Sequence, residues 1–244
     1  MTAQRIVPAL RILKIAPFLR PVVQALYKRS APTLRKELMG LSFSSPIGVA
    51  AGIDKRGEYA DEVACYSPGF LEIGPLRDVM FAIQHLQKHT EDIIVLGNLS
   101  NTKDLERSFS LLYDFVDAIV LNVSLNTSIS HVIDHLLDLR RYNDTYKPII
   151  FKLFPDLTPD VLDQLADYML RSGIDGVMVN AEFVHDVQEK TLGLMPIIAV
   201  AEISSPERAA QILDTGADLI AINNSPFHYG PNLIKRINKY LEKR

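Results

Sequence analysis

Short runs of apolar residues recur along the chain, separated by segments in which apolar positions repeat with helical spacing. Each run is too short for a helix and is rich in β-branched residues, so each predicts a buried β-strand. The eight runs are Ile47–Ala51, Phe70–Ile73, Ile93–Leu96, Ala118–Val123, Ile149–Leu153, Val177–Val179, Ile197–Val200 and Leu219–Ile222. Such continuous apolar strands indicate a parallel sheet that is covered on both faces.

Amphipathic segments fill the intervals between these runs. One begins with Thr158 and Pro159, which suit the N-cap and the first helical position, and Gly173 marks its end. Further helices are expected at Tyr59–Tyr66, Asp78–Lys88, Asp104–Tyr113, Ser130–Arg141, Ser205–Thr215 and Asn232–Leu241. Eight strands that alternate with helices predict an α/β fold, the (β/α)8 TIM barrel. An open doubly wound sheet is the alternative, but it calls for a glycine-rich first turn, and the sequence contains no GxGxxG motif.

The first 36 residues differ from the rest in charge. They contain eight Lys or Arg and no Asp or Glu, so they carry +8, and the remainder must carry −11 to give the net charge of −3. Cations and the prolines at 8, 17 and 21 interrupt the apolar residues, which excludes a transmembrane span and favours two short amphipathic helices. We therefore divide the chain into a basic N-terminal extension, 1–39, and a barrel, 40–244.

Two interpretations of this extension stay open. A cationic amphipathic element can lie on an anionic membrane surface, which would give peripheral contact with the inner face of the membrane through residues 1–36. Alternatively, the extension packs across the mouth of the barrel.

Composition restricts the class of protein and its cellular compartment further. A hydrophobic fraction of 48% excludes a disordered chain, and the single cysteine, Cys65, excludes a disulfide scaffold and favours the cytoplasm. The balance of 26 basic and 29 acidic residues is not that of a nucleic-acid-binding protein. The pairs His85/His89 and His131/His135 have the spacing of zinc ligands, but no carboxylate or cysteine supports them, so no metal site is predicted. A homodimer is left open.

Polar residues follow the apolar runs at the carboxyl ends of the predicted strands, where barrel enzymes carry their chemistry. Besides Ala51 and Gly52 at the end of the first strand, they are Lys55, Glu72, Asn98, Asn122, Ser124, Lys152, Asn180, Glu182, Glu202, Asn223 and Asn224. Lys152 lies inside an apolar strand, and an inward ammonium group needs an anionic partner. That partner is either a ligand or a carboxylate of Glu72, Glu182 or Glu202.

Several segments resemble dihydroorotate dehydrogenases, especially the quinone-linked class, and keep the same order along the chain. They are Gly40–Lys55, Leu71–Gly74, Val95–Lys103, Leu121–Ser124, Phe151–Leu157, Gly173–Gly176, Pro196–Val200 with Ile203–Ser205, and Gly230–Ile237. The likeness runs from about Gly40 to Leu241, which is nearly all of the predicted barrel.

The resemblance implies an FMN-dependent oxidoreductase of pyrimidine biosynthesis that converts dihydroorotate to orotate. In that family a serine after the fourth strand is the base, and a lysine on the fifth strand stabilises the charge on reduced flavin. Ser124 and Lys152 are therefore the catalytic candidates. The flavin-binding candidates are Ala51, Gly52, Lys55, Asn98, Asn122, Lys152, Asn180, Asn223 and Asn224.

The chain departs from the family pattern at the positions of the catalytic base and of the phosphate-binding glycines. Leu125 stands where the base is expected, so only Ser124, in a shifted loop, could accept the proton. Ala201 and Glu202 replace two glycines whose bare backbone approaches the flavin phosphate, and Ser225 replaces a third. A carboxylate about 4 Å from a phosphate is repulsive by roughly 1–4 kcal/mol. The loops after the second and sixth strands are also short.

Two functional hypotheses follow. The first is an active flavin oxidoreductase of the dihydroorotate dehydrogenase type. The second is a catalytically inactive, divergent barrel that serves as a binding or partner protein, in which Lys152 and Glu202 form a compensating pair.

Overall fold

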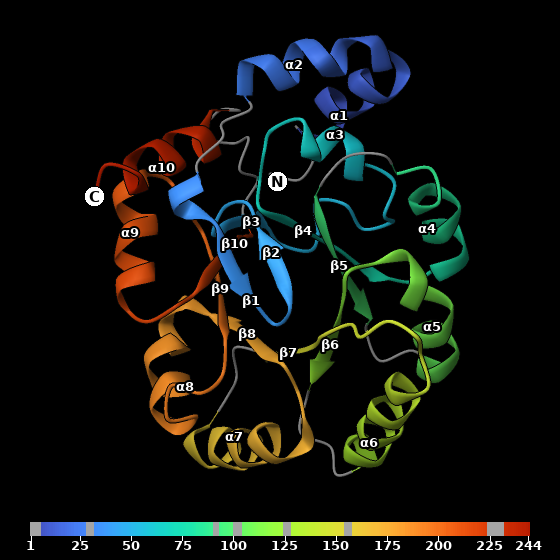
Figure 1. The fold of residues 1–244 in the computed structure, drawn as a ribbon, viewed down its shortest axis with the longest axis vertical. Coiled ribbons are helices and arrows are strands. Elements are labelled where there is room, and N and C mark those ends of the chain that lie inside the picture. The colour runs from blue at the N-terminus through green and yellow to red at the C-terminus, as the bar shows by residue number, and fades with distance from the viewer. Residues whose placement is uncertain are drawn as a thin grey trace.

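The computed structural model describes residues 6–27, 32–89, 93–99, 104–123, 128–153, 158–223 and 232–244, and its centre is a closed barrel (Figure 1). Neighbouring strands are parallel, and β10 pairs with β3 to close the ring. The strands are β3 (Ile47–Val49), β4 (Phe70–Leu76), β5 (Ile94–Leu99), β6 (Ala118–Val123), β7 (Ile149–Leu153), β8 (Gly176–Asn180), β9 (Ile197–Ala201) and β10 (Leu219–Ile222). The predicted TIM barrel is confirmed, and each of the eight apolar runs coincides with or overlaps one of these strands.

An outer ring of helices covers the barrel (Figure 1). Its members are α3 (Ala60–Ala64), α4 (Val79–Leu86), α5 (Leu105–Leu112) with the 3-10 turn η3 (Tyr113–Phe115), α6 (Ser128–Arg141), α7 (Pro159–Ser172), η4 (Ala181–Phe183), α8 (Val184–Lys190), α9 (Pro206–Asp214) and α10 (Leu233–Leu241). Helix α7 starts at Pro159 and ends at Gly173, whose φ of +86° suits a residue without a side chain. Its apolar residues face inward, as their spacing predicts, because Leu162, Leu165 and Met169 are buried.

Alternation along the strands divides the apolar residues into two packed layers. One layer fills the barrel, with Phe70, Leu96, Val120 and Ile150 among its members, and the other lies between the strands and the helices. Gly48 is required inside the barrel, because a Cβ at this position would lie 2.4 Å from the ring of Phe70.

A short antiparallel hairpin, which the pattern of apolar runs does not predict, plugs the amino-terminal end of the barrel. It consists of β1 (Lys36–Leu38) and β2 (Leu41–Phe43). Phe43 is fully buried and meets Phe70 edge to face, with ring centroids 5.7 Å apart. The hairpin spans the boundary that we placed between residues 39 and 40, so that boundary remains a prediction about domains.

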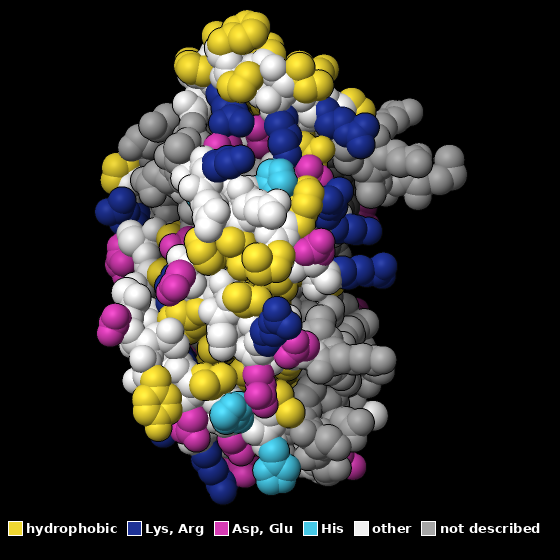
Figure 2. Space-filling model, turned by 90° about the vertical axis from the view of Figure 1, so that its right-hand side faces the viewer, with side chains coloured by type: hydrophobic (Ala, Val, Ile, Leu, Met, Phe, Trp, Pro, Cys, Tyr) yellow, Lys and Arg dark blue, Asp and Glu magenta, His cyan; other side chains and the backbone are white. Residues whose placement is uncertain are grey.

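The N-terminal helices form a cap on one side of the barrel, next to α3 (Figure 1). They are α1 (Ile6–Ile15), the 3-10 turn η1 (Pro17–Leu19), α2 (Arg20–Tyr27) and a second turn η2 (Pro32–Leu34). Leu10 and Leu13 are buried against the barrel, whereas the outer face is apolar and exposed. Figure 2 shows this apolar cap with Lys and Arg side chains gathered directly beneath it. Among the described residues, no helix combines the length and the apolar character needed to cross a membrane.

Candidate ligand site at the barrel mouth

A buried carboxylate organises the carboxyl end of the barrel. Glu72, on β4, is fully buried, and both of its oxygens accept hydrogen bonds. Lys152 on β7 donates from Nζ to Oε1 at 2.7 Å and to Oε2 at 2.8 Å, and the backbone N–H of Ala51 donates to Oε2 at 2.7 Å. Asn98 on β5 donates from Nδ2 to Oε1. The burial of Glu72 is thus offset by an ion pair and by hydrogen bonds to both oxygens.

Two asparagines extend this network to the next strand. Asn98 Nδ2 donates to Asn122 Oδ1 at 3.3 Å, and Asn122 Nδ2 donates back to Asn98 Oδ1 at 3.0 Å. Asn122, on β6, is also the cross-strand partner of Lys152. Four consecutive strands therefore contribute one polar side chain each to a single cluster across the mouth.

Strand periodicity explains why these four side chains meet. Glu72, Asn98, Asn122 and Lys152 each follow an apolar residue of the barrel interior by two positions, and residues two apart in a strand point to the same face. Those apolar residues are Phe70, Leu96, Val120 and Ile150. The polar cluster is thus the next layer above an apolar layer, at the end where ligands bind in this fold.

The cluster corrects one prediction. The second hypothesis paired Lys152 with Glu202, but of the three candidate carboxylates it is Glu72 that binds the ammonium group. The reason is position: Glu72 points into the barrel from β4, whereas Glu202 follows the last residue of β9 and is exposed. A glutamate inside the apolar run Phe70–Ile73 was the available signal, by the same reasoning that singled out Lys152.

The other predicted site residues lie around this cluster or outside the described residues. Among the described residues, Glu72 accepts hydrogen bonds from Ala51, Asn98 and Lys152, and Asn98 in turn bonds Asn122. Lys55 and Asn223 are exposed, and Asn180 is half-buried at the end of β8. Gly52 has a φ of +104° and donates from its backbone N–H to the carbonyl of Gly74 at 2.9 Å. Ser124 and Asn224 lie outside the described residues, as do Leu125 and Ser225.

A buried aspartate holds the loop that leads from Ala51 and Gly52 to α3. Asp54 accepts hydrogen bonds from the backbone N–H groups of Glu58 at 2.9 Å and Tyr59 at 2.8 Å. Burial raises the pKa of Asp54, and these backbone bonds oppose the rise. The loop is therefore fixed by its own side chain, which keeps the backbone of Ala51 in place beside Glu72.

The opposite side of the mouth presents no free donor at the start of α9. Pro206 has no N–H, Ser205 Oγ accepts from the N–H of Arg208 at 3.3 Å, and Glu207 binds its own backbone N–H and Ser205. These bonds lower the pKa of Glu207. Ala201 ends β9 and Glu202 follows it, and both carry side chains at positions where glycines were expected. The described residues thus offer donors for a ring, but they do not fit the phosphate of FMN.

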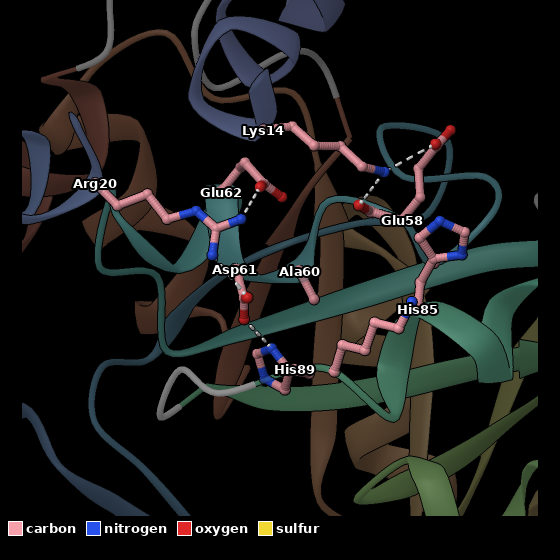
Figure 3. A pocket seen from close by; sticks show the side chains of 10 residues that line it. Lys14, Arg20, Glu58, Ala60, Asp61, Glu62, His85 and His89 are labelled. Atoms are coloured by element: carbon pink, nitrogen blue, oxygen red, sulfur yellow. Dashed lines mark hydrogen bonds and ion pairs between the residues drawn. The ribbon is translucent and has the colours of Figure 1, made fainter. Parts of the chain in front are cut away.

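A second charged cluster joins the N-terminal cap to the barrel around a pocket of about 340 Å³ (Figure 3). Arg20 donates to Asp61 at 2.9 Å and also binds Glu62, whose side chain is only 2% exposed. His89 Nδ1 is paired with Asp61, and Lys14 binds Glu58 at 3.1 Å. Burial raises the pKa of Glu62, and Arg20 opposes the rise. The contacts of Arg20 and Lys14 fasten the cap to α3 and to the loop before it.

The histidines of this cluster have protein partners. Besides the bond of His89 to Asp61, His85 Nδ1 lies 2.9 Å from the carbonyl oxygen of Phe81. Within the part of the chain that the structure describes, no three His, Cys, Asp or Glu side chains gather in a way that could hold a metal ion.

The sequence and the fold of this chain are similar to those of known dihydroorotate dehydrogenases. No family model matches the chain. The dihydroorotate dehydrogenases (quinone) of Yersinia pseudotuberculosis serotype O:1b and Yersinia pestis bv. Antiqua are each 26% identical to it over 299 aligned residues, which cover 88% of this chain and 89% of the relative. The solved DHODH of Eimeria tenella in complex with ferulenol aligns with a TM-score of 0.78 at 19% identity, covering 92% of this chain and 90% of that chain. Its ligand-free form aligns with a TM-score of 0.77 at 18% identity, covering 93% and 94%.

The alignment also shows how many residues of the relatives have no counterpart in this chain. Because 88% of 244 residues is about 215, roughly 80 of the 299 aligned positions have no residue here. The structure is consistent with trimmed loops: only Arg77 and Asp78 separate β4 from α4. The chain is similar to the quinone-linked dihydroorotate dehydrogenases over most of its length, at low sequence identity and with fewer residues.

Proposed function

We propose that this barrel binds a small molecule at its mouth but does not oxidise dihydroorotate, and so acts as a catalytically inactive relative of the dehydrogenases. The observation that carries the proposal is the pairing of Lys152 with both oxygens of the buried Glu72. A lysine assists flavin reduction when its charge is available to the negative charge that develops on the ring. Here that charge is already compensated. Leu125, at the position expected for the base, supports the same conclusion.

The second candidate is a flavin oxidoreductase of pyrimidine biosynthesis that uses FMN and dihydroorotate. It is favoured by one observation, the assembly of Asn98, Asn122 and Lys152 in a single cluster. In this candidate, these residues would hold the flavin ring, and bound FMN would supply the acceptor for a hydride. The side chains at the start of α9 and the end of β9 argue against the phosphate of that cofactor.

Flavin retention separates the two candidates. We expect protein that has been incubated with excess FMN and passed through a gel-filtration column to emerge without visible flavin absorbance, while the free FMN is recovered in the salt volume. Elution of one flavin per chain with the protein peak would contradict the proposed loss of the cofactor and would favour the oxidoreductase.

We further propose that the N-terminal cap contacts an anionic membrane surface, which would place this cytoplasmic barrel at the inner face of a membrane. Large apolar side chains lie on the outer face of α1, η1 and α2: Ile15 is 84% exposed, Phe18 77% and Leu26 59%. Basic residues of the same segment can add an attraction of about 1 kcal/mol each near an anionic surface. This combination is typical of an interfacial helix pair.

A matched pair of exposed apolar residues tests the membrane proposal. We expect Phe18→Asp to reduce co-sedimentation with phosphatidylserine-containing vesicles by about tenfold or more, because burying one large apolar side chain stabilises by about 1.5–3 kcal/mol. Leu192→Asp is the control, since Leu192 is equally exposed, at 77%, but lies after α8. If the unaltered protein does not sediment with the vesicles, or if both variants lose binding equally, the cap is not a membrane contact.

A further inference from the structure

We infer that the side of the barrel next to the cap is a second membrane contact, in which Arg56 and Lys88 bind the headgroups of anionic lipids. The inference rests on the membrane contact proposed for the N-terminal cap, and it adds the face of the barrel that lies against the bilayer. The exposed apolar face of the cap and the Lys and Arg side chains gathered beneath it share one side of the molecule (Figure 2). We call Arg56 and Lys88 the basic patch.

Contacts within the protein place the basic patch beside the cap. Lys88, just after α4, lines the pocket between the cap and the barrel together with Arg20 of α2 (Figure 3). Arg56, in the loop before α3, stacks on Phe81 of α4, with its guanidinium carbon 3.6 Å from the ring centroid. The ring of His85 lies 4.3 Å from that of Phe81, centroid to centroid, and His85 lines the same pocket. The patch therefore borders the junction of cap and barrel.

The two cations of the patch are available to an external anion. Both residues are exposed, and neither forms an ion pair with another described residue. The three carboxylates that line the neighbouring pocket are at most 21% exposed and have partners within the protein: Glu58 with Lys14, Asp61 with Arg20 and His89, and Glu62 with Arg20. The exposed acid of α4, Asp78, caps the start of the helix by accepting from the N–H of Phe81 at 2.9 Å, whereas Lys88 follows the end of the helix.

Continuity with the apolar face of the cap indicates a lipid bilayer as the partner of this patch. Exposed side chains such as Ile15 and Phe18 are stabilised when they enter the acyl boundary of a bilayer, about 5–10 Å deep. Cations beneath them then lie at the level of the headgroups, where anionic lipids attract each Lys or Arg. An acidic protein would match the cations but not the adjoining apolar face.

Co-sedimentation with two kinds of vesicle tests the inference: phosphatidylcholine alone, and phosphatidylcholine with phosphatidylserine. We expect the double variant Arg56→Gln with Lys88→Gln to bind the phosphatidylserine vesicles about 30-fold more weakly than the unaltered protein, since each cation contributes about fivefold. Its binding to phosphatidylcholine alone should not change. In 1 M NaCl, where the screening length is about 3 Å, the difference between the two proteins should disappear.

Two control variants separate a local contact from an effect of net charge or of packing. Arg171→Gln with Lys190→Gln removes two positive charges from α7 and α8, which lie on the far side of the barrel from the cap (Figure 1). Arg56→Lys keeps the charge of the patch but replaces the guanidinium that stacks on Phe81. Both controls should bind the phosphatidylserine vesicles as the unaltered protein does.

The outcomes distinguish this inference from the membrane contact on which it rests. If Phe18→Asp loses binding while the double variant of the patch binds phosphatidylserine vesicles normally, the inference is wrong and the contact of the cap stands. A loss that the variant of α7 and α8 shares equally, or that is as large on phosphatidylcholine alone, would also overturn the inference. If the unaltered protein sediments with neither kind of vesicle, both proposals are wrong.

Discussion

Replacement of Lys152 by alanine is expected to lower the free energy of unfolding by about 3–5 kcal/mol, because it leaves the fully buried Glu72 as an unpaired charge. Asn98 and the backbone N–H of Ala51 would still donate to Glu72, but they carry no compensating charge. Urea denaturation followed by circular dichroism at pH 7 measures the loss.

Two further variants make this measurement specific. Arg244→Ala breaks an ion pair with Asp214 in which both side chains are about half exposed, so it should cost less than about 1 kcal/mol. The double variant Lys152→Met with Glu72→Gln removes both charges and should recover most of the stability lost by Lys152→Ala. A loss from Lys152→Ala no larger than that from Arg244→Ala would refute the buried pair.

Arg20→Ala is expected to loosen the N-terminal cap, with amide hydrogen exchange in α1 and α2 about 100-fold faster. Arg20 is the link between α2 and α3, and without it the almost fully buried Glu62 loses its cation. A loss of about 3 kcal/mol for breaking a buried pair corresponds to this factor. Hydrogen exchange followed by mass spectrometry gives the readout for each helix. Arg107→Ala, which removes an exposed pair with Asp104, is the control and should not alter the cap.

The stability of the Arg20→Ala variant should depend on pH. Burial raises the pKa of Glu62 above its ordinary value, and Arg20 is the main charge that opposes this rise. The folded variant should therefore bind a proton more readily than the unfolded chain does, so its stability should rise as the pH falls toward the raised pKa of Glu62. The faster exchange caused by Arg20→Ala should accordingly be smaller at pH 5 than at pH 7, after correction for the intrinsic exchange rate. Equal protection of α1 and α2 in the variant and the unaltered protein would contradict the role of this pair.

The barrel could be predicted from local patterns because each strand coincides with or overlaps a short apolar run, and amphipathic segments separate these runs. The hairpin of β1 and β2 could not, since its three-residue strands are too short for alternation to stand out, and Phe43 becomes a core residue only when it meets Phe70. Tertiary contact, and not local propensity, makes this element.

The site shows the same division between local and long-range information. Lys152 and Glu72 each signal a buried charge in need of a partner, but they are 80 residues apart, and three candidate carboxylates satisfied the sequence equally well. Only the closed barrel, which brings β4 and β7 to face each other at its mouth, shows that Glu72 is the partner of Lys152. Ser124 and Asn224 belong to loops outside the described residues, so their roles remain predictions.

Anaerobic addition of dihydroorotate to the protein in the presence of FMN tests the central claim most directly, with flavin absorbance and orotate formation followed together. The paired charges of Lys152 and Glu72 and the leucine at position 125 predict that the absorbance stays constant and that no orotate forms. Bleaching of the flavin with an equal amount of orotate would contradict this account and would identify the barrel as a working dehydrogenase.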